Sequence, residues 1–359
     1  MLLAVLAVLA PVSVKTVQVS LIESHTNLSV TAQEAAPNAF LVASLPIPYR
    51  SQAPLEIRAV TRPTNKVARL SILDESGDRL VRVEFAPLAA GEALELDLVT
   101  TLMSSSAPPD DGQNVRLATP ADLPEEIRPY LGVQPGIESA DERVRKIASE
   151  VSGKDLAHAA DDVLRWLGKN ISAGGGPQGA LEVLERGSSA CTGFANLGAA
   201  IFVAARIPAR VLPCILVGVE QQEHYIVEVW TKELGWSKVE TTLKRFPLDD
   251  SLHVILRQAR PDSPRGPGHV PILHPRGTGV DAAFRYDEKR CFQGAKRLGA
   301  FDLDEKDEAR IRETAKAGFD ALTRKAAQGP SVELAPAGKL GTRLGSRARA
   351  LLEMSQRKP

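Results

Sequence analysis

The central part of the chain, residues 188–257, has one helical pattern followed by four short strand patterns. The helical pattern belongs to GSSACTGFANLGAAIFVAARIPAR, in which small polar residues lead into an apolar stretch. The strand patterns are ARVLPCILVGV, HYIVEVW, WSKVETT and HVILRQA. Short consecutive strands pair with one another, and the apolar face of the resulting sheet must be covered. The sequence therefore predicts an antiparallel sheet packed on one helix, which is an α+β architecture.

The N-terminal part of the chain, residues 12–105, has a different pattern. Its short runs are rich in alternating or β-branched residues, and turns that contain Pro, Asn or Gly lie between them. Strands at this spacing are typical of a β-sandwich. The polar, proline-rich stretch SSSAPPDDGQN then begins a linker, which we place at residues 106–138.

The domain that contains the central unit follows this linker and spans residues 139–257. Helical patterns at 139–152 and 156–171 open it, and Ser139 stands where the first helix needs an N-cap. A third helical pattern, at 180–187, ends in a glycine.

The two ends of the chain differ from these domains. Residues 1–11 begin with MLLAVLAVLA, which resembles the apolar part of a secretory signal. We therefore expect export to the periplasm or the extracellular space, and a cytoplasmic location if the run is not a signal. The run is too short for a bilayer span, which takes about 20 residues. Residues 258–359 are predicted to form an irregular segment rich in Pro and Gly and then a helical tail, whose main helix covers 302–328.

Composition argues against several classes of function. The 44 basic and 44 acidic residues balance and aromatic residues are 4% of the chain, so no nucleic-acid surface is expected. The three cysteines form no CxxC pair, which argues against a disulfide framework and a cysteine-rich structural zinc site. No acidic cluster resembles a calcium loop. We expect no metal, no organic cofactor and no stable membrane span, and the oligomeric state stays open.

Three side chains of the central unit have the order and the chemical types that thiol acyl transfer uses. Cys191 opens the helix, His224 lies on the second strand and Glu240 ends the third. The start of a helix carries partial positive charge, which favours a thiolate over a thiol. A nearby imidazole can take the thiol proton, and a carboxylate can fix the tautomer of the imidazole. The sequence thus predicts an activated cysteine.

Each of these residues also has a less demanding interpretation. Most cysteines do no chemistry: Cys214, within an apolar strand, is predicted to be inert core, and Cys291 has no partner pattern. A lone histidine is more often structural, and Glu240 on its own resembles a surface acid. Glu228 competes for the orienting role. Its place about 13–14 Å along the strand from His224 suits a supporting salt bridge or a substrate contact better.

The three sequence blocks resemble those of the transglutaminase-like superfamily. The first is similar to the family's G-x-C-x-x-x-A helix followed by R-x-x-G-I-P-A-R, with Arg206 in place of the glycine. HYIVEVW resembles H-x-W-x-E, with Ile226 where Trp is usual. GWSKVETT resembles G-W-x-x-x-D-x-T, with Glu240 in the aspartate position. The resemblance covers residues 140–250 and is sharpest over 187–242.

This resemblance implies a papain-like thiol fold and cysteine-dependent acyl transfer at peptide or amide bonds. Because the layout is similar to bacterial members with an upstream β-sandwich, we favour a cysteine peptidase or amidase. It implies Cys191 as the nucleophile, His224 as general base and acid, and Glu240 as the orienting acid. A protein or peptide would be the substrate, and a thioester would form on the cysteine. Weaker candidates for contacts with the oxyanion or the substrate are Gln178, Glu228 and Trp236.

Three other functions stay open at this point. The resemblance does not distinguish a hydrolase from a protein-crosslinking transglutaminase. The replacements at Ile226 and Glu240, together with the long charged C-terminal region, motivate a second hypothesis, a catalytically silent scaffold that binds proteins. A zinc site built from Cys191, His224 and nearby acids is a further alternative, although no fourth ligand is evident.

Overall fold

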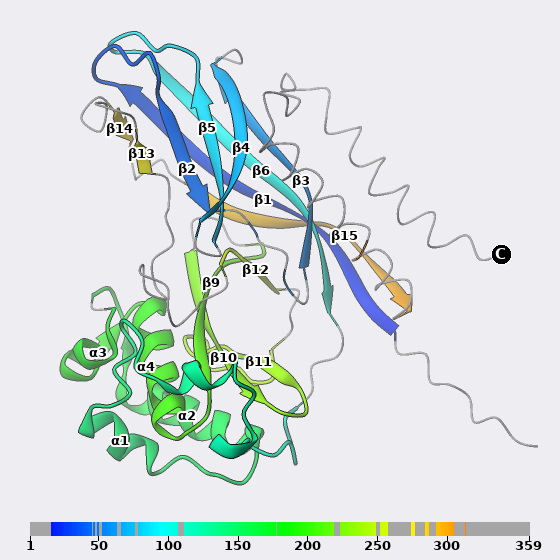
Figure 1. Ribbon diagram of the computed structural model, residues 1–359, viewed down its shortest axis with the longest axis vertical. Helices are drawn as coiled ribbons and strands as arrows, with labels where there is room; N and C mark the ends of the chain where they lie inside the picture. Colours follow the sequence, from blue (N-terminus) through cyan, green and yellow to red (C-terminus); the bar gives the residue numbers. More distant parts are fainter. Residues whose placement is uncertain are drawn as a thin grey trace, which may run out of the picture.

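Two groups of β-strands lie at one end of the molecule, and a group of helices with a third sheet lies at the other (Figure 1). The structure is a computed structural model. It describes residues 16–44, 46, 49, 52–62, 66–75, 78–106, 111–176, 178–218, 223–248, 252–257, 274–276, 284–286, 292–304 and 313. The predicted signal at 1–11 and Cys291 lie outside the described residues.

The first sheet is built on two long strands, β1 (Thr16–Ala32) and β6 (Ala93–Ser106). Its order is β14–β1–β6–β3, with β3 (Gln52–Arg62) beside β6 and β14 (Phe284–Tyr286) beside β1. β15 (Phe292–Asp304) also pairs with β1, and every pair in this sheet is antiparallel. Segments that are far apart in the sequence therefore share one sheet.

The second sheet has the order β13–β2–β5–β4 and is also antiparallel. Its strands are β2 (Phe40–Ser44), β4 (Val67–Glu75), β5 (Asp78–Phe85) and β13 (His274–Arg276). Apolar residues from both sheets form one buried cluster, which includes Leu28, Val30, Leu41, Val81, Val83 and Leu96. The two sheets thus share a hydrophobic core, and the described residues of the segment 12–105 are β-rich, as predicted.

The prediction that 258–359 is irregular and then helical needs correction in its first half. This part of the chain supplies β13, β14 and β15, and β15 pairs along β1 from Thr16 opposite Asp304 to Asn27 opposite Phe292. The helix predicted to start at residue 302 cannot do so, because 302–304 belong to β15. A long-range strand partner overrides the local helical pattern here. Apart from Glu313, which is helical, the rest of the predicted tail lies outside the described residues.

Four helices open the second half of the described chain. They are α1 (Glu142–Ala148), α2 (Leu156–Asn170), α3 (Ala180–Arg186) and α4 (Cys191–Ala204). Two short 3₁₀ helices precede them, at Pro120–Asp122 and Arg128–Leu131. A small parallel pair, β7 (Ser172–Ala173) and β8 (Ser188–Ser189), connects the ends of α2 and α3.

Local capping explains where these helices begin and end. The N-cap of α1 is Asp141, whose side chain accepts a hydrogen bond from the backbone N–H of Arg143, so the prediction of Ser139 as the cap is wrong. Ser139 is itself buried before the helix begins. Gly187 ends α3 with a left-handed φ of 68°, a conformation that glycine adopts without a side-chain clash.

The third sheet has the order β11–β10–β9–β12, and all its pairs are antiparallel. Its strands are β9 (Ala209–Leu216), β10 (Glu223–Thr231), β11 (Gly235–Val239) and β12 (His253–Ile255). This sheet and α4 form the predicted α+β unit, which the structure confirms.

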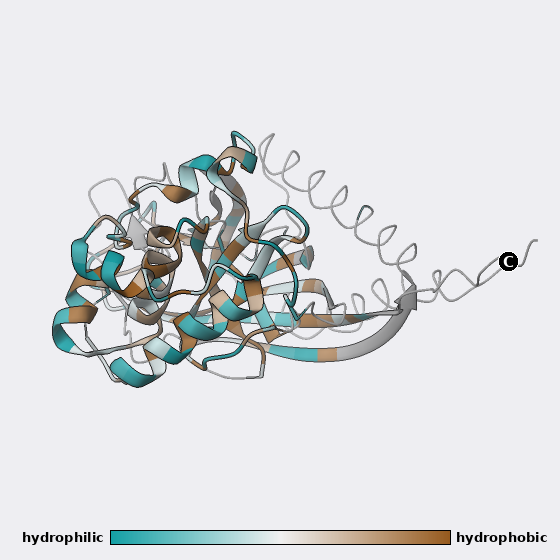
Figure 2. Ribbon diagram, turned by 90° about the horizontal axis from the view of Figure 1, so that it is seen from below, coloured by the Kyte–Doolittle hydropathy of each residue, from teal (hydrophilic) through white to brown (hydrophobic). Residues whose placement is uncertain are grey.

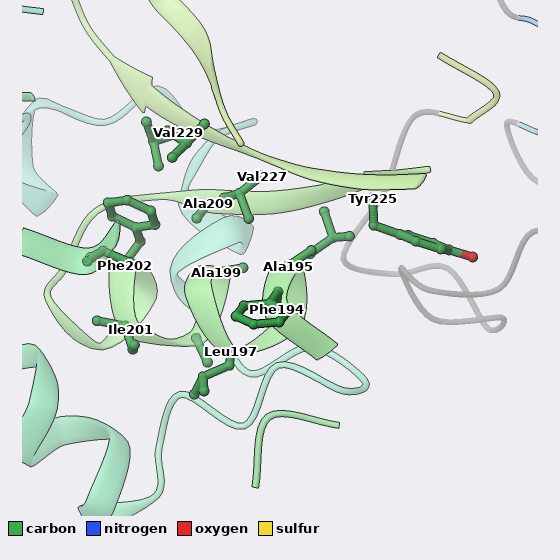
Figure 3. Packing of buried hydrophobic residues seen from close by; sticks show 14 of the residues in the cluster. Phe194, Ala195, Leu197, Ala199, Ile201, Phe202, Ala209, Tyr225, Val227 and Val229 are labelled. Carbon is green, nitrogen blue, oxygen red and sulfur yellow. The ribbon is translucent and has the colours of Figure 1, made fainter. Parts of the chain in front are cut away.

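α4 is apolar on all sides, and all its residues except its first and last are buried. A helix of this composition belongs in the interior of a domain. Small residues on the sheet-facing side let the helix axis approach β9 and β10 closely. Figure 3 shows this packing among Ala195, Ala199, Phe202, Ala209, Val227 and Val229.

The outer helices have an apolar face toward this core and a polar face toward solvent (Figure 2). In α2 the buried positions follow helical spacing, at Leu156, Ala159, Ala160, Val163, Leu164 and Leu167. No helix in the described part of the chain has the length and apolar composition needed to cross a membrane.

Candidate active site

Cys191 is the first residue of α4 and is partly exposed, whereas the residues after it are buried. The N-cap position, Ala190, supplies no side-chain hydrogen bond to the helix. The partial positive charge of the helix start therefore acts directly on the sulfur. Cys214 is fully buried in β9, where its thiol donates to the backbone carbonyl of His224 at 3.4 Å, as the core prediction requires. Neither of these two cysteines is in a disulfide bond.

His224 lies near the start of β10, opposite Cys214 of β9, and only 3% of its surface is exposed. Its Nε2 lies 2.6 Å from Oε2 of Glu240. Its ring is also hydrogen bonded to the side chain of Cys191. The structure thus brings together the three side chains that the sequence singled out.

Glu240 directly follows β11 and is fully buried. Its Oε1 accepts hydrogen bonds from the backbone N–H groups of Thr242 at 2.9 Å and Leu243 at 3.3 Å. Its own backbone pairs with Arg245 in both directions. The extra methylene of glutamate relative to aspartate is accommodated, because the contact with His224 is as short as an ordinary charge-assisted hydrogen bond.

The electrostatics of this pair favour the ionised forms. Burial lowers the pKa of His224, but hydrogen bonds to Cys191 and Glu240 outweigh it and raise the pKa to about 9. Burial raises the pKa of Glu240, but the hydrogen bond with His224 and the nearby ring of His253 outweigh it and lower the pKa to about 2. At neutral pH the site therefore holds an imidazolium beside a carboxylate.

We expect this pair to contribute most to the free energy of unfolding between about pH 4.5 and 6.5. The lowered pKa of Glu240 gives a contribution that is complete above its unfolded value of about 4.3 and is lost as the pH falls through about 2. The raised pKa of His224 gives a contribution that is complete below about 6.5 and is lost as the pH rises through about 9. Urea unfolding from about pH 2 to 9 should show the wild type losing stability toward both ends of the range. In Glu240→Gln both losses should be smaller. A difference between the two proteins that does not change with pH would contradict this.

His253, which the sequence did not single out, also lies at this site. It starts β12, its ring stacks on that of His224 with the centroids 5.9 Å apart, and its Nε2 lies 3.4 Å from Oε2 of Glu240. Burial lowers its pKa. Only the pairing of β12 with β9 brings it here, and no spacing in the sequence signals that pairing.

The ligand atoms of His224, Glu240 and His253 lie within 4.8 Å of one another, and in the described part of the chain these three residues are the group that could hold a metal ion. The set differs from the zinc alternative above, because it contains His253 and does not contain Cys191. A metal ion would have to replace the 2.6 Å contact between His224 and Glu240.

Glu228 is 1% exposed, so the suggestion that it contacts the substrate is not supported. Its Oε2 instead accepts hydrogen bonds from Arg210 Nε at 2.8 Å and from the Tyr49 hydroxyl. The salt bridge considered as the other role for Glu228 is the one observed. Trp236 packs over the guanidinium of Arg210 at 4.0 Å and meets Tyr130 edge to face. Its predicted contact with a substrate stays a prediction.

Gln178 lies in the loop before α3, and its side chain is exposed. Its backbone carbonyl accepts a hydrogen bond from Asn196 of α4 at 2.8 Å, which ties this loop to the cysteine helix. A role for its side-chain amide at an oxyanion stays a prediction. Ile226 is fully buried with Leu212 and Cys214, so the replacement of the family's tryptophan lies in the core and not on an exposed wall.

A cysteine at the start of a buried helix, hydrogen bonded to a histidine that is paired with a carboxylate on an antiparallel sheet, defines a thiol-site α+β domain. Residues 145–241 match the model of the transglutaminase-like superfamily, so this domain is similar to members of that superfamily.

Two solved structures illustrate the likeness. A candidate cysteine protease from Cytophaga hutchinsonii is 15% identical, with a TM-score of 0.53 over 79% of this chain and 90% of that chain. The periplasmic domain of TgpA from Pseudomonas aeruginosa is 18% identical, with a TM-score of 0.30 over 59% of this chain and 92% of that chain. The first shows a shared fold. No curated protein matches the sequence.

Proposed function

We propose that the protein is a cysteine hydrolase that cleaves peptide or amide bonds, with Cys191 as nucleophile, His224 as general base and acid, and Glu240 as the orienting acid. The observation that carries this proposal is the continuous set of contacts from the helix start through His224 to the anchored carboxylate. The family match over 145–241 supports the same class of chemistry.

The first half of the reaction uses the thiolate of Cys191 and the imidazolium of His224. The sulfur attacks the carbonyl carbon of the scissile amide, and the carbonyl electron pair moves onto oxygen to give a tetrahedral oxyanion. The backbone N–H of Cys191, at the helix start, is the donor that we assign to this oxyanion, and the side chain of Gln178 is a second candidate. The carbon–nitrogen bond then breaks as His224 donates its proton to the leaving amine, and a thioester remains.

The second half releases the acyl group. The neutral His224 takes a proton from a water molecule, whose oxygen attacks the thioester carbon. The carbon–sulfur bond breaks, the carboxylic acid leaves, and the thiolate and imidazolium are restored. Glu240 stays ionised throughout and stabilises the imidazolium, as the third member of a triad does.

We favour water as the acyl acceptor over an amine. The candidate cysteine protease from C. hutchinsonii with the same fold is consistent with hydrolysis. A crosslinking enzyme would instead incorporate a fluorescent primary amine into a protein substrate. Incubation of the protein with peptide substrates and such an amine separates the two, because hydrolysis releases new termini without incorporation.

The experiment that tests the proposed function is the pH dependence of iodoacetamide labelling at Cys191, read by peptide mass spectrometry. An ordinary thiol with a pKa of about 8.5 labels slowly at pH 6. We expect Cys191 to label rapidly at pH 6 in the wild type and slowly in His224→Ala, with buried Cys214 as the internal control. Ordinary labelling that does not depend on His224 would overturn the proposal and favour the silent scaffold.

Gly198 offers a test of how closely the helix and the site are coupled. A methyl group at this position in α4 would meet Cγ2 of Thr241 at 2.7 Å, and Thr241 directly follows Glu240. We expect Gly198→Ala to slow the labelling of Cys191 several-fold because it displaces the orienting acid. Stability should change less, since about 1 kcal/mol gained in helix propensity offsets part of an overpacking cost of about 1–3 kcal/mol.

The matched control is Gly168→Ala in α2. Its methyl group would meet Cδ of Lys244 at 3.1 Å, and this flexible side chain can move aside. Labelling rates of both variants should show slower labelling of Cys191 in Gly198→Ala alone. Urea unfolding of both variants measures any accompanying loss of stability. Equal labelling rates in the two variants would show that α4 and Glu240 are not coupled through Thr241.

A further inference from the structure

His253 is a buried histidine that the reaction described above does not use. Only 2% of its surface is exposed, and neither Nδ1 nor Nε2 makes a hydrogen bond of regular geometry to another described residue. Its Nε2 lies 3.4 Å from Oε2 of Glu240, the same oxygen that contacts His224. Burial of an imidazole without a partner is unfavourable, so the contact with Glu240 is the interaction that this position provides.

With His253 included, the carboxylate of Glu240 is surrounded by four nitrogens. The backbone N–H groups of Thr242 and Leu243 donate to Oε1, while His224 and His253 approach Oε2. An ionised carboxylate has about four acceptor sites, so these partners can use all of them. These contacts fix the position of the Glu240 carboxylate and stabilise its ionised form.

His253 is suited to donate a proton in a hydrogen bond and not to carry charge. Burial lowers its pKa, Glu240 acts in the opposite direction, and Lys238 and His224 lower it further. A neutral imidazole has one N–H, and the carboxylate beside Nε2 places that hydrogen on Nε2.

We propose that His253 is a positioning residue whose neutral ring donates its Nε2–H to Oε2 of Glu240 and so holds the carboxylate in place for His224. The inference rests on the proposed function, because the position of Glu240 matters to a reaction only if Cys191 is the nucleophile. It assigns to β12 a role that none of the three sequence blocks contains.

The upstream sheets help to fix β12, which has only three residues. Gln52 of β3 is 1% exposed, and its side-chain amide donates to the carbonyl of Ile255 at 2.7 Å. Its amide oxygen accepts from the backbone N–H of Ile255 at 2.8 Å. The side-chain amide of Gln52 thus bonds to both the C=O and the N–H of Ile255, as the backbone of a neighbouring strand would. The N-terminal part of the chain therefore supports the strand that carries His253.

The test compares His253→Leu with His253→Gln. Leucine fills the same space without a donor, whereas the amide nitrogen of glutamine can replace Nε2. In His253→Leu we expect the pH at half-maximal labelling of Cys191 to rise by about one unit, toward that of an ordinary thiol, because a poorly held His224 stabilises the thiolate less. His253→Gln should restore the wild-type profile. A chelator in every sample prevents stray divalent ions from binding to His224, Glu240 and His253.

A measurement on the wild type keeps the inference testable if His253→Leu does not fold. Long-range ¹H–¹⁵N spectra of histidine-labelled protein should show His253 neutral, with its proton on Nε2, from pH 5 to 9. A proton on Nδ1, or a charged ring, would overturn the inference. So would rapid wild-type labelling together with an unshifted profile in His253→Leu. Slow, His224-independent labelling in the wild type would overturn the proposed function itself.

Discussion

Replacement of Cys191 by alanine is expected to lower kcat/KM for a peptide substrate by about 10⁴-fold or more. The sulfur forms the covalent bond in the proposed reaction, and a methyl group cannot replace it. Cys214 cannot take over, because it is fully buried and its thiol donates to the carbonyl of His224. Quenched fluorescent peptide libraries provide the substrate, and initial rates of the two proteins measure the loss.

The matched control is Cys214→Ala, which removes the other described thiol and leaves Cys191 in place. It should keep kcat/KM within a few-fold of the wild type, although it removes a buried sulfur from the core. Because Cys191 is partly exposed, its replacement by alanine should change the free energy of unfolding by only about 0.5 kcal/mol. Equal activity of Cys191→Ala and the wild type would rule out the thiol mechanism.

The parts of the fold that the sequence predicted well depend on short-range patterns. α4 begins at Cys191 as expected, because the small polar residues and the apolar run around it are consecutive in the chain. The strands that carry His224 and Glu240 follow from alternation over a few residues. Once these strands pair as neighbours on one helix, the site is largely assembled.

The parts that could not be predicted depend on which distant strand pairs with which. β15 is a strand because β1 pairs along its length, and no window around residues 292–304 contains that partner. His253 reaches Glu240 only because β12 pairs with β9. The error at Ser139 has a different cause, since two polar residues near a helix start both resemble caps and only geometry selects Asp141.

Arg210 illustrates the same limit and gives the largest expected effect on stability. It matches the end of the family's helix block, yet the sequence does not show what it contacts. In the structure it is 2% exposed in β9, its Nε and a terminal nitrogen approach Oε2 of Glu228 at 2.8 and 2.7 Å, and it donates to the Tyr49 hydroxyl at 2.8 Å. The contact with Tyr49 joins the upstream segment to the third sheet.

We expect Arg210→Met to lower the free energy of unfolding by about 3 kcal/mol, measured by urea denaturation at pH 7. The cost comes from Glu228, whose buried carboxyl group would lose its main partner. Lys238 lies opposite Glu228 on β11 and is itself largely buried, so it can offset part of this cost. The expected loss is therefore at the lower end of the range for broken buried ion pairs.

The double variant Arg210→Met with Glu228→Leu separates a lost ion pair from lost packing. If the cost is an unpaired buried charge, removal of Glu228 as well should recover most of the stability, because a buried ion pair and an apolar pair of similar volume are nearly equivalent. If the double variant is as unstable as the sum of the two single ones, the cost lies instead in the stacking of Arg210 on Trp236 at 4.0 Å and its bond to Tyr49. The first outcome is the one that the 1% exposure of Glu228 leads us to expect.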